Sequence, residues 1–493
     1  MLLNSPNVKL CIVGVSRDCF PISLTKSRLA SVCEIAKSKG IDIYPISVII
    51  ESESDTVKAL LEAKEIGASA AIVYLGNFGP EAPETIFAQK FCGPVMFCAA
   101  SEENREGLQD NRGDAYCGML NASYNLSLRN VKAYIPENPV GTIKEVVKMI
   151  KDFLPIAKIY IGVKSLKIFG FGPRPADFFA CNAPIKPFYD LGVEVMENSE
   201  LDLLEKFNEV DENDKDVQII LKEMTEELGV GNKYPKVLPR LARFEVALIR
   251  FYYNNLGNSS FGVFANKCWP AFEHFFGFVP CYVNSRLAAK GIPVACEVDF
   301  YGALSEYMCM LATDMVPALL DLNNTVPRDM IDNYTDLKGA TYNDLFMGFH
   351  CGNVSSCVLS NFEMKYQKIM KSLLEPDTDP GITIGTLEGT IRPGEITLFR
   401  LQGNAEGKLV SYIAEGEVIN MDPSTFGGVG VFAVPNMARF YRHVLIEKRF
   451  PHHGAVAFKK VGKILFESIK LLGVNDINYP LPKNIYYPSE NPF

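Results

Sequence analysis

Two acidic residues in the second half of the chain each follow an apolar segment. Glu297 comes directly after residues 292–296, and Asp321 comes directly after residues 315–320, and both segments are predicted as short strands. A carboxylate at the end of a strand is held rigidly and can still meet a ligand. The pair therefore qualifies for a metal site or for acid–base catalysis.

Histidine is scarce in this chain, with five residues, and two of them are adjacent. His350 ends the apolar segment FMGFH, while His452 and His453 precede Gly454 in the segment PHHGAV. Adjacent side chains of an extended segment point to opposite sides, so we expect one of this pair to face a site. Carboxylates and imidazoles drawn from separate strand ends form a ligand set that suits a divalent metal ion.

The segment between the two acids allows them to meet. Residues 299–315 are predicted as a helix, and a strand–helix–strand excursion brings the chain back to the neighbouring strand end. Asp299, at the start of this helix, is predicted first as its N-cap and second as a partner of the site. From the residues alone, the alternative that each acid caps a helix or closes a turn stays open.

The elements that carry these residues belong to an α/β chain. Strands and helices alternate over the first third, and a second alternating region starts near residue 160, which predicts two parallel sheets with helices on both faces. After about residue 320, short β-rich segments are separated by glycine or proline, which predicts an antiparallel sheet or a small barrel. The predicted fold class is α/β, with two doubly wound, Rossmann-like parallel-sheet domains followed by a β-rich C-terminal domain.

The predicted boundaries divide the chain into three domains. These are an N-terminal α/β domain at 1–160, a second α/β domain with Glu297 at 161–315, and a β-rich domain with Asp321, His350 and His453 at 316–493.

Composition argues against several classes of protein. The 493 residues carry a formal charge of −9, without the basic surface of a nucleic-acid-binding protein. No apolar run is long enough to span a membrane, and we expect no secretory signal at the start. The thirteen cysteines show no zinc-type pairing, which is typical of a reducing cytoplasm and predicts a cytoplasmic location. No Walker A sequence occurs, which disfavours a kinase.

Several of these segments together resemble the L-fucose/L-arabinose isomerase superfamily, nearest its fucose isomerase-like branch. The resemblance spans nearly the whole chain, and no single motif carries it. The matching segments are VSRDCFP at 15–21, CW at 268–269, ACEVD at 295–299, LLD ending at Asp321, HCGN at 350–353, TLEGTIRPGEITLFRL at 386–401 and HHGA at 452–455.

The resemblance implies a metal-dependent aldose–ketose isomerase that acts through a cis-enediolate on an L-fucose-, D-arabinose- or L-arabinose-like sugar. It implies Mn²⁺, or another divalent cation, bound by Glu297, Asp321 and His453, with the two acids as the catalytic pair. His350 and His452 are possible metal or substrate contacts. The family also implies a homo-oligomer, a trimer or a hexamer.

Three further residues are candidates for binding the sugar. Trp269, the only tryptophan, could stack on the apolar face of a sugar, and a purely structural place in the core is the alternative. Arg17 follows the first predicted strand, where parallel sheets bind ligands, and could reach the site of another subunit or form a structural salt bridge. Arg174 lies in GFGPRP, which lacks the spacing of a dinucleotide fingerprint and is predicted as a turn.

Two other functions stay open at this stage. One is a non-catalytic sugar-binding or regulatory protein on the same fold, and the other is an epimerase or aldolase that also forms an enediolate. The sequence leaves open which sugar is bound and which carboxylate takes the carbon-bound proton.

Overall fold

The computed structural model describes residues 4–110, 112–182, 184–334 and 336–493. The chain divides into two compact units. One, the N-terminal unit, comprises residues 6–161 together with 467–473. The other, the large unit, comprises residues 162–466 and 474–493, with the short segment that precedes Pro6.

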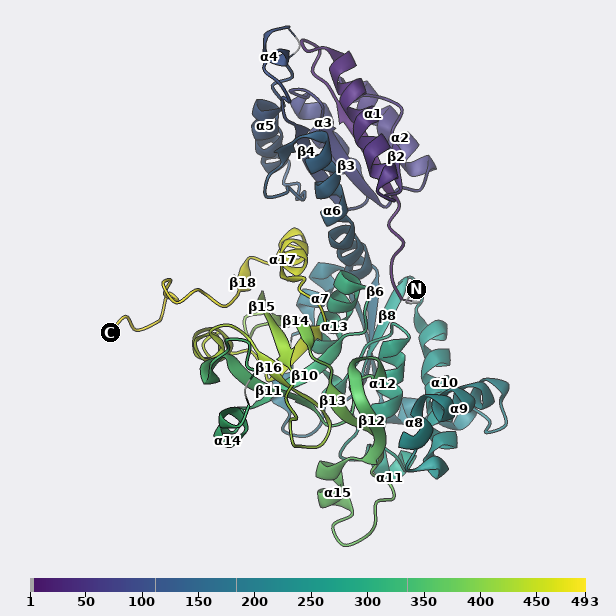
Figure 1. Cartoon of the computed structure of the whole chain (residues 1–493). Coiled ribbons are helices and arrows are strands. Elements are labelled where there is room, and N and C mark those ends of the chain that lie inside the picture. The colour runs from purple at the N-terminus through teal and green to yellow at the C-terminus, as the bar shows by residue number, and fades with distance from the viewer. Residues whose placement is uncertain (1–3, 111, 183, 335) are drawn as a thin grey trace. The chain divides into compact units, whose positions relative to one another are not determined.

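The N-terminal unit contains a five-stranded parallel sheet in the order β2-β1-β3-β4-β5 (Figure 1). Every residue of β1, β3 and β4 is buried, as expected of parallel strands that helices cover on both faces. The strands are β1 (Leu10–Val15), β2 (Ile43–Pro45), β3 (Ala70–Leu75), β4 (Val95–Ala100) and β5 (Val140–Gly141). The helices are α1 (Ile22–Ser38), α2 (Glu53–Glu65), α3 (Glu81–Lys90), α4 (Gly107–Asp110), α5 (Ala115–Leu128) and α6 (Ile143–Lys164).

The large unit begins with a second parallel sheet, in the order β7-β6-β8-β9. Phe169 and Phe171 of β6, Phe264 of β8 and Phe251 of α10 form an aromatic core on one face of it. The strands are β6 (Leu166–Gly172), β7 (Glu194–Ser199), β8 (Phe261–Ala265) and β9 (Val294–Ala295). The helical elements are η1 (Phe179–Cys181), α7 (Lys186–Leu191), α8 (Glu200–Glu209), α9 (Lys215–Leu228), η2 (Gly229–Gly231), η3 (Pro235–Val237), α10 (Leu238–Asn255), α11 (Phe272–Phe276), α12 (Cys281–Ala289) and η4 (Cys296–Val298).

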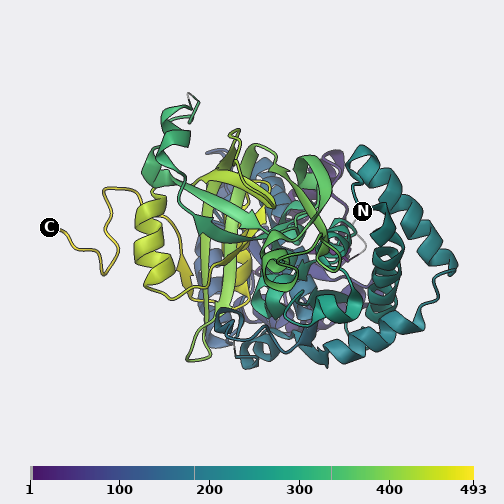
Figure 2. The same ribbon diagram turned by 90° about the horizontal axis from the view of Figure 1, so that it is seen from below.

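A β-rich sheet of nine strands completes the large unit. Six of its strands, in the order β16-β11-β10-β17-β14-β15, pair antiparallel, and β15 returns to β16, so they close a small barrel. The predicted antiparallel, β-rich region is therefore confirmed, and so is the α/β fold class with two parallel sheets before it. Figures 1 and 2 show the teal helices α8, α9 and α10 at one side of the large unit and its yellow C-terminal segments at the other.

The elements of this region follow in chain order. The strands are β10 (Ala318–Asn324), β11 (Leu345–His350), β12 (Leu359–Tyr366), β13 (Ile384–Ile391), β14 (Gly394–Gly403), β15 (Leu409–Ile419), β16 (Gly428–Ala433), β17 (His453–Ala457) and β18 (Asp476–Asn478). The helical elements are α14 (Arg328–Asp332), η5 (Tyr342–Asp344), η6 (Ser356–Val358), α15 (Lys368–Leu374), α16 (Met437–Phe440), the π-helical turn η7 (Tyr441–Ile446) and α17 (Gly462–Leu471).

Helix α13 (Phe300–Thr313) lies between the two sheets of the large unit. It contacts β6, β8 and β9 of the parallel sheet and β10, β14 and β17 of the barrel. All residues from Tyr301 to Ala312 are buried, which explains why this helix is apolar on nearly all sides, with Ser305 and Glu306 as its polar exceptions. Its N-terminus therefore lies where residues of both sheets can reach it.

Two details of the predicted elements around the acids are wrong. The strand before Glu297 has only two residues, and Glu297 itself lies in η4. Asp321 lies in the middle of β10 and not at a strand end, and β9 and β10 belong to different sheets. A barrel strand buries only one face, so polar residues alternate within it, and an apolar run does not mark where it ends.

The three predicted domain boundaries stay a proposal, because the structure groups the second and third predicted domains in one compact unit. Among the described residues, no helix combines the length and the apolar character that a membrane crossing requires.

A buried ion network in the large unit generates a stability prediction. Arg286 of α12 contacts Glu223 at 2.8 Å and Glu245 at 2.6 Å, and it also contacts Glu227. Arg286 is 7% exposed and Glu245 is fully buried. Breaking a buried ion pair by removing one partner costs about 3–5 kcal/mol, because the remaining charge stays out of water. We therefore expect Arg286→Met to lower the thermal unfolding midpoint clearly, as measured by circular dichroism.

The control is Lys222→Met, which removes a cation from an exposed pair with Glu226 at 3.8 Å. It should leave the midpoint nearly unchanged. Equal midpoints for the two variants would contradict the importance of the network.

Candidate metal site

Glu297 is placed by an unusual turn at the end of the parallel sheet. It and Val298 both have left-handed backbone angles, with φ of 61° and 59°. Such angles cost about 1–3 kcal/mol for a residue other than glycine and are found most often at functional sites. The Val298 N–H donates to the Asn266 carbonyl at 3.0 Å, which anchors the turn beside β8.

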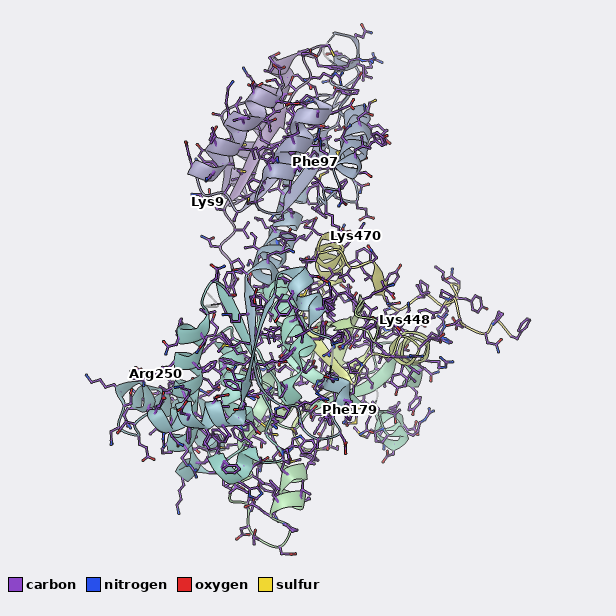
Figure 3. The ribbon with its side chains drawn as sticks, turned by 180° about the vertical axis from the view of Figure 1, so that it is seen from behind. Lys9, Phe97, Phe179, Arg250, Lys448 and Lys470 are labelled. Carbon is purple, nitrogen blue, oxygen red and sulfur yellow. The ribbon has the colours of Figure 1, made fainter. Side chains whose placement is uncertain are left out.

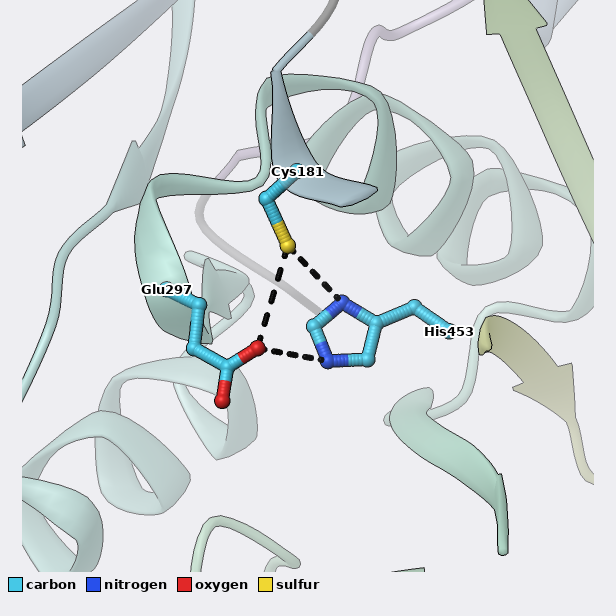
Figure 4. Close-up of side chains that lie close together, drawn as sticks. All are labelled: Cys181, Glu297 and His453. Carbon is cyan, nitrogen blue, oxygen red and sulfur yellow. Dashed lines mark hydrogen bonds and ion pairs between the residues drawn. The ribbon is translucent and has the colours of Figure 1, made fainter. Parts of the chain in front are cut away.

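Asp321 and His453 face each other across neighbouring antiparallel strands. They form a register pair between β10 and β17. Nε2 of His453 is 3.4 Å from Oδ1 of Asp321 and 3.4 Å from Oε2 of Glu297. Figure 4 shows the approach of Glu297 to the His453 ring. Two carboxylates, one from the turn after β9 and one from β10, thus converge on one nitrogen atom.

His452 also lies at this point. Its Nε2 is 3.8 Å from Glu297 Oε2 and 3.7 Å from Asp321 Oδ1, and the two imidazole rings are 4.2 Å apart. The expectation that only one histidine of the pair faces the site is therefore wrong. The reason is that β17 begins at His453, so His452 lies before the strand, where side chains do not alternate.

The other nitrogen of His453 is held by a buried ion pair. Nδ1 lies 2.8 Å from Asp299 Oδ2, and Asp299 is bound on both oxygens by Arg400 of β14, at 2.6 and 2.9 Å. Asp299 Oδ1 also accepts the Gly302 N–H at 2.8 Å, which confirms the predicted N-cap of α13. Because Nδ1–H of His453 donates to Asp299, the lone pair of Nε2 is directed at Glu297 and Asp321.

The electrostatics of the three carboxylates differ. Burial raises the pKa of Glu297 to about 7, and the nearby Asp321 adds to this shift while His453 opposes it. Burial also acts to raise the pKa of Asp321, but the contact with His453 outweighs it and the net shift is downward. At Asp299, Arg400 and His453 overcome burial and hold the pKa well below its ordinary value. Asp299 is therefore a fixed anion.

These donor atoms fit a divalent ion. Oxygen and nitrogen ligands lie about 2.0–2.2 Å from such an ion, so two of them that share it are roughly 3.0–3.5 Å apart. The two 3.4 Å separations at His453 Nε2 fall within this range and are too long for good hydrogen bonds. A lone pair directed at two carboxylates is also unfavourable unless a cation or a proton lies between them. The ligand atoms that could share an ion fall into two groups, Cys181, Glu297 and His453, and Asp321, His452 and His453. The predicted set of Glu297, Asp321 and His453 stays a prediction.

His350 ends β11, as predicted, and is buried. Its Nδ1 accepts the Asn353 N–H at 3.2 Å, so in the neutral ring the proton is on Nε2. His350 acts to lower the pKa of both Glu297 and Asp321. Its role as a metal or substrate contact stays a prediction.

An aromatic wall lies beside the histidines. The Phe178 ring packs edge-on against Trp269, at 6.2 Å between centroids, and against His452, at 5.4 Å. Trp269 is partly exposed and does not lie deep in the core. The structure thus brings Trp269 to the neighbourhood of the candidate metal site, through Phe178.

Arg174 lies in a cavity next to the site. Its guanidinium is 4.9 Å from the centre of the exposed Phe179 ring. Arg174 lines a cavity of about 460 Å³ together with Cys181, which contacts Glu297, and Ser199, the N-cap of α8. Arg174 is the only cationic side chain among the residues that line this cavity.

Arg17 belongs to the N-terminal unit, at the end of β1, where the expected crevice of its sheet lies. It pairs with Glu81 at 3.5 Å and lies over the Phe78 ring at 5.3 Å. Its part in the site stays a prediction, and a structural salt bridge accounts for these contacts equally well.

Sequence reasoning missed two residues of the site, Arg400 and Cys181. Arg400 and Gln402 lie two positions apart in an otherwise apolar strand, so their side chains share one face. This pair of polar residues was the signal that could have revealed Arg400. Cys181 offered no signal, because a single cysteine in a loop has no distinctive spacing. Its Sγ lies 3.7 Å from Glu297 Oε2 and 3.8 Å from His453 Nδ1, and burial raises the pKa of this thiol to about 11.

The fold and this carboxylate–histidine centre define an α/β protein with a candidate metal site between a parallel sheet and a β-barrel. Residues 11–164 match the N-terminal domain of fucose/sulfoquinovose isomerases, and residues 348–478 match the C-terminal domain of L-fucose isomerases. Together the two matches cover more than half of the chain. The chain belongs to the fucose isomerase-like family.

Two relatives are both named sulfoquinovose isomerase. The protein from Alkalicoccus urumqiensis is 23% identical over 317 residues, which cover 63% of this chain and 64% of the relative. The protein from Clostridium sp. (strain MSTE9) is 26% identical over 295 residues, which cover 59% of each. The matched part thus spans less than two thirds of the length of either relative.

The contact between Asp299 and His453 generates a prediction. We expect Asp299→Asn to weaken Mn²⁺ binding about 10- to 100-fold, because an amide no longer orients the ring or raises the basicity of Nε2. Titration of metal-free protein, followed by the electron paramagnetic resonance of free Mn²⁺, measures this. Asp377→Asn, at an exposed position, is the control. Unchanged affinity in Asp299→Asn would show that His453 does not bind the ion through Nε2.

Proposed function

We propose that this protein is a divalent-metal-dependent aldose–ketose isomerase that acts through a cis-enediolate. The observation that carries the proposal is the convergence of Glu297 and Asp321 on Nε2 of His453, with Asp299 bound to the opposite nitrogen. This is the arrangement that a metal-binding acid–base pair requires. Membership of the fucose isomerase-like family supports the same reaction class.

We further propose that the substrate is sulfoquinovose or a similar sulfonated aldose. Both relatives carry that substrate in their names, and one family match includes it. A sulfonate needs a cationic or strongly polar partner, and Arg174 is the cation that lines the adjoining cavity. The proposed substrate is thus more specific than the fucose- or arabinose-like sugars that the resemblance alone implied.

The chain's own groups divide the work as follows. One carboxylate of the Glu297–Asp321 pair takes the proton from C2 of the open-chain aldose and returns it to C1. The other moves the proton between the two hydroxyl oxygens, so that the aldehyde becomes an alcohol and C2 becomes a ketone. A bound Mn²⁺, or another divalent ion, supplies Lewis-acid stabilisation of the negative charge that develops on the sugar.

The surrounding side chains position the substrate. Asp299 and Arg400 keep the His453 ring in place, so the ligand nitrogen does not have to reorganise during turnover. The wall formed by Trp269, Phe178 and His452 offers apolar ring surface to the C–H face of the sugar. This surface also shields the carboxylates from bulk water.

The proposal extends to assembly and location. We propose a homo-oligomer, a trimer or a hexamer, in which Arg17 could act at the site of another subunit. A cytoplasmic location suits the cysteines, all of which are free thiols in the described residues. Native mass spectrometry would establish the number of subunits.

The direct test is NMR of an aldose panel, including sulfoquinovose, incubated with metal-free and Mn²⁺-loaded protein. We expect one aldose to be converted to its ketose only with the metal. Conversion to an epimeric aldose, or release of a product with fewer carbons, would instead indicate an epimerase or an aldolase. Binding without turnover of any sugar would indicate a non-catalytic sugar-binding protein.

Replacing the carboxylate of Glu297 by an amide tests its proposed role in catalysis. We expect Glu297→Gln to lower turnover about 10²- to 10⁴-fold, because it removes both a metal ligand and an acid–base group. Steady-state rates at saturating Mn²⁺ measure this, and Glu226→Gln, at an exposed position, is the control. Full turnover and full metal occupancy in Glu297→Gln would overturn the site assignment.

Solvent isotope incorporation distinguishes proton transfer from hydride transfer. A carboxylate that carries a proton between C2 and C1 can exchange it with water, so turnover in D₂O should place deuterium on the product carbon next to the carbonyl. NMR of the ketose measures the label. If label is absent while isomerisation is fast, Glu297 and Asp321 are metal ligands only and have no acid–base role.

Arg174 generates a prediction on selectivity. We expect Arg174→Gln to raise KM for sulfoquinovose about 10- to 100-fold, the cost of losing a charged hydrogen bond, with a smaller effect on kcat. The KM for the unsulfonated analogue D-glucose should not change. Arg250→Gln, an exposed arginine on α10, is the control (Figure 3). Equal effects on both sugars would show that Arg174 does not bind the sulfonate.

A further inference from the structure

Cys181 adds a sulfur atom to the candidate metal site. It lies at the end of η1, is buried, and reaches Glu297 Oε2 at 3.7 Å (Figure 4). Cys181, Glu297 and His453 form one cluster of possible ligand atoms, and Asp321, His452 and His453 form another, so both clusters share His453. The thiol is therefore part of the same centre and not an isolated cysteine.

The position of the sulfur suits coordination better than hydrogen bonding to His453. Although Sγ lies 3.8 Å from Nδ1 of His453, that nitrogen is already bound to Asp299 at 2.8 Å. A metal–sulfur distance of about 2.3 Å and a metal–oxygen distance of about 2.1 Å place sulfur and oxygen roughly 3.5–3.7 Å apart on a tetrahedral ion. The observed separation of 3.7 Å between Sγ and Glu297 Oε2 matches that value.

We propose that Cys181 is a conditional metal ligand, which binds thiophilic divalent ions such as Co²⁺, Zn²⁺ and Cd²⁺ but not Mn²⁺ or Mg²⁺. The proposal rests on the proposed metal site. When a thiophilic ion binds, the S–H bond breaks, a metal–sulfur bond forms, and one proton leaves to the buffer. No electron is transferred. Hard ions prefer oxygen and nitrogen ligands and leave the thiol protonated.

This ligand changes what the site can do. With Glu297, Asp321 and His453 alone, three protein ligands leave positions open for a sugar, as in catalytic metal sites. With Cys181 added beside Glu297 and His453, one position fewer remains open for the substrate. The identity of the bound ion would thus decide how much of the coordination sphere is left for a sugar.

The test is a Co²⁺ titration of the metal-free full-length protein, followed by absorption spectroscopy. We expect a near-ultraviolet sulfur-to-cobalt charge-transfer band in the wild type that saturates at one Co²⁺ per chain. The band should be lost in Cys181→Ser and in Cys181→Ala. Cys357→Ser, which removes an exposed thiol, should retain it. Proton release on Zn²⁺ binding, measured in a weakly buffered solution, should fall by one per chain in the two Cys181 variants.

Mn²⁺ binding, followed by electron paramagnetic resonance, separates failure of this proposal from failure of the site. A wild type that binds Mn²⁺ without giving a cobalt–sulfur band would overturn the role of Cys181 alone. A band that persists in Cys181→Ser would overturn it too. A wild type that binds neither ion would overturn both proposals. Cys181→Ser and Cys181→Ala must themselves bind Mn²⁺, because loss of the band through misfolding would also remove Mn²⁺ binding.

Discussion

The buried carboxylate of Asp299 is the interaction on which the rest of the site depends. It accepts hydrogen bonds from the backbone of α13, from both arms of Arg400 on β14, and from His453 on β17. All of these groups are buried, so each bond is strong and each loss leaves a charged partner without compensation. One side chain thus joins the start of α13 to the barrel and orients the nitrogen that faces Glu297 and Asp321.

Helix α13 explains why that carboxylate can exist at this depth. An apolar helix buried between two sheets brings its N-terminus, with free backbone N–H groups and a partial positive charge, into the interior. An anion is stabilised there, and Gly302 leaves the space for it. A Cβ atom at position 302 would lie 2.5 Å from Asp299 Oδ2. The packing of the core and the electrostatics of the site are therefore set by the same few residues.

The fold class and the residues of the candidate site could be predicted from the sequence more reliably than the geometry in which these residues meet. Fully buried strands such as β3 and β4 appear as continuous apolar runs, and Gly- and Pro-punctuated segments marked the barrel, so the elements could be predicted from pattern. The pairing of strands could not, because an apolar run does not say which sheet it joins. Asp321 was assigned to the β-rich region but was expected at a strand end next to that of Glu297, and it lies within a strand of the barrel. The pair Asp299–Arg400 spans 101 positions, and no local pattern encodes a contact of that separation.

The site is assembled from features that are unfavourable on their own. Glu297 and Val298 hold left-handed backbone angles, and Val298 is β-branched, so the turn is strained. Glu297 is largely buried beside a second carboxylate, which raises its pKa towards neutrality. A cation between these groups, as proposed, would offset the repulsion between the two carboxylates. Its binding would also compensate for the strain of the turn that brings Glu297 to His453. Binding of an ion stabilises the folded state in proportion to the logarithm of its concentration above Kd, about 4 kcal/mol at a thousandfold excess. That is comparable with the cost of two strained residues, so the proposed ion would compensate for the turn.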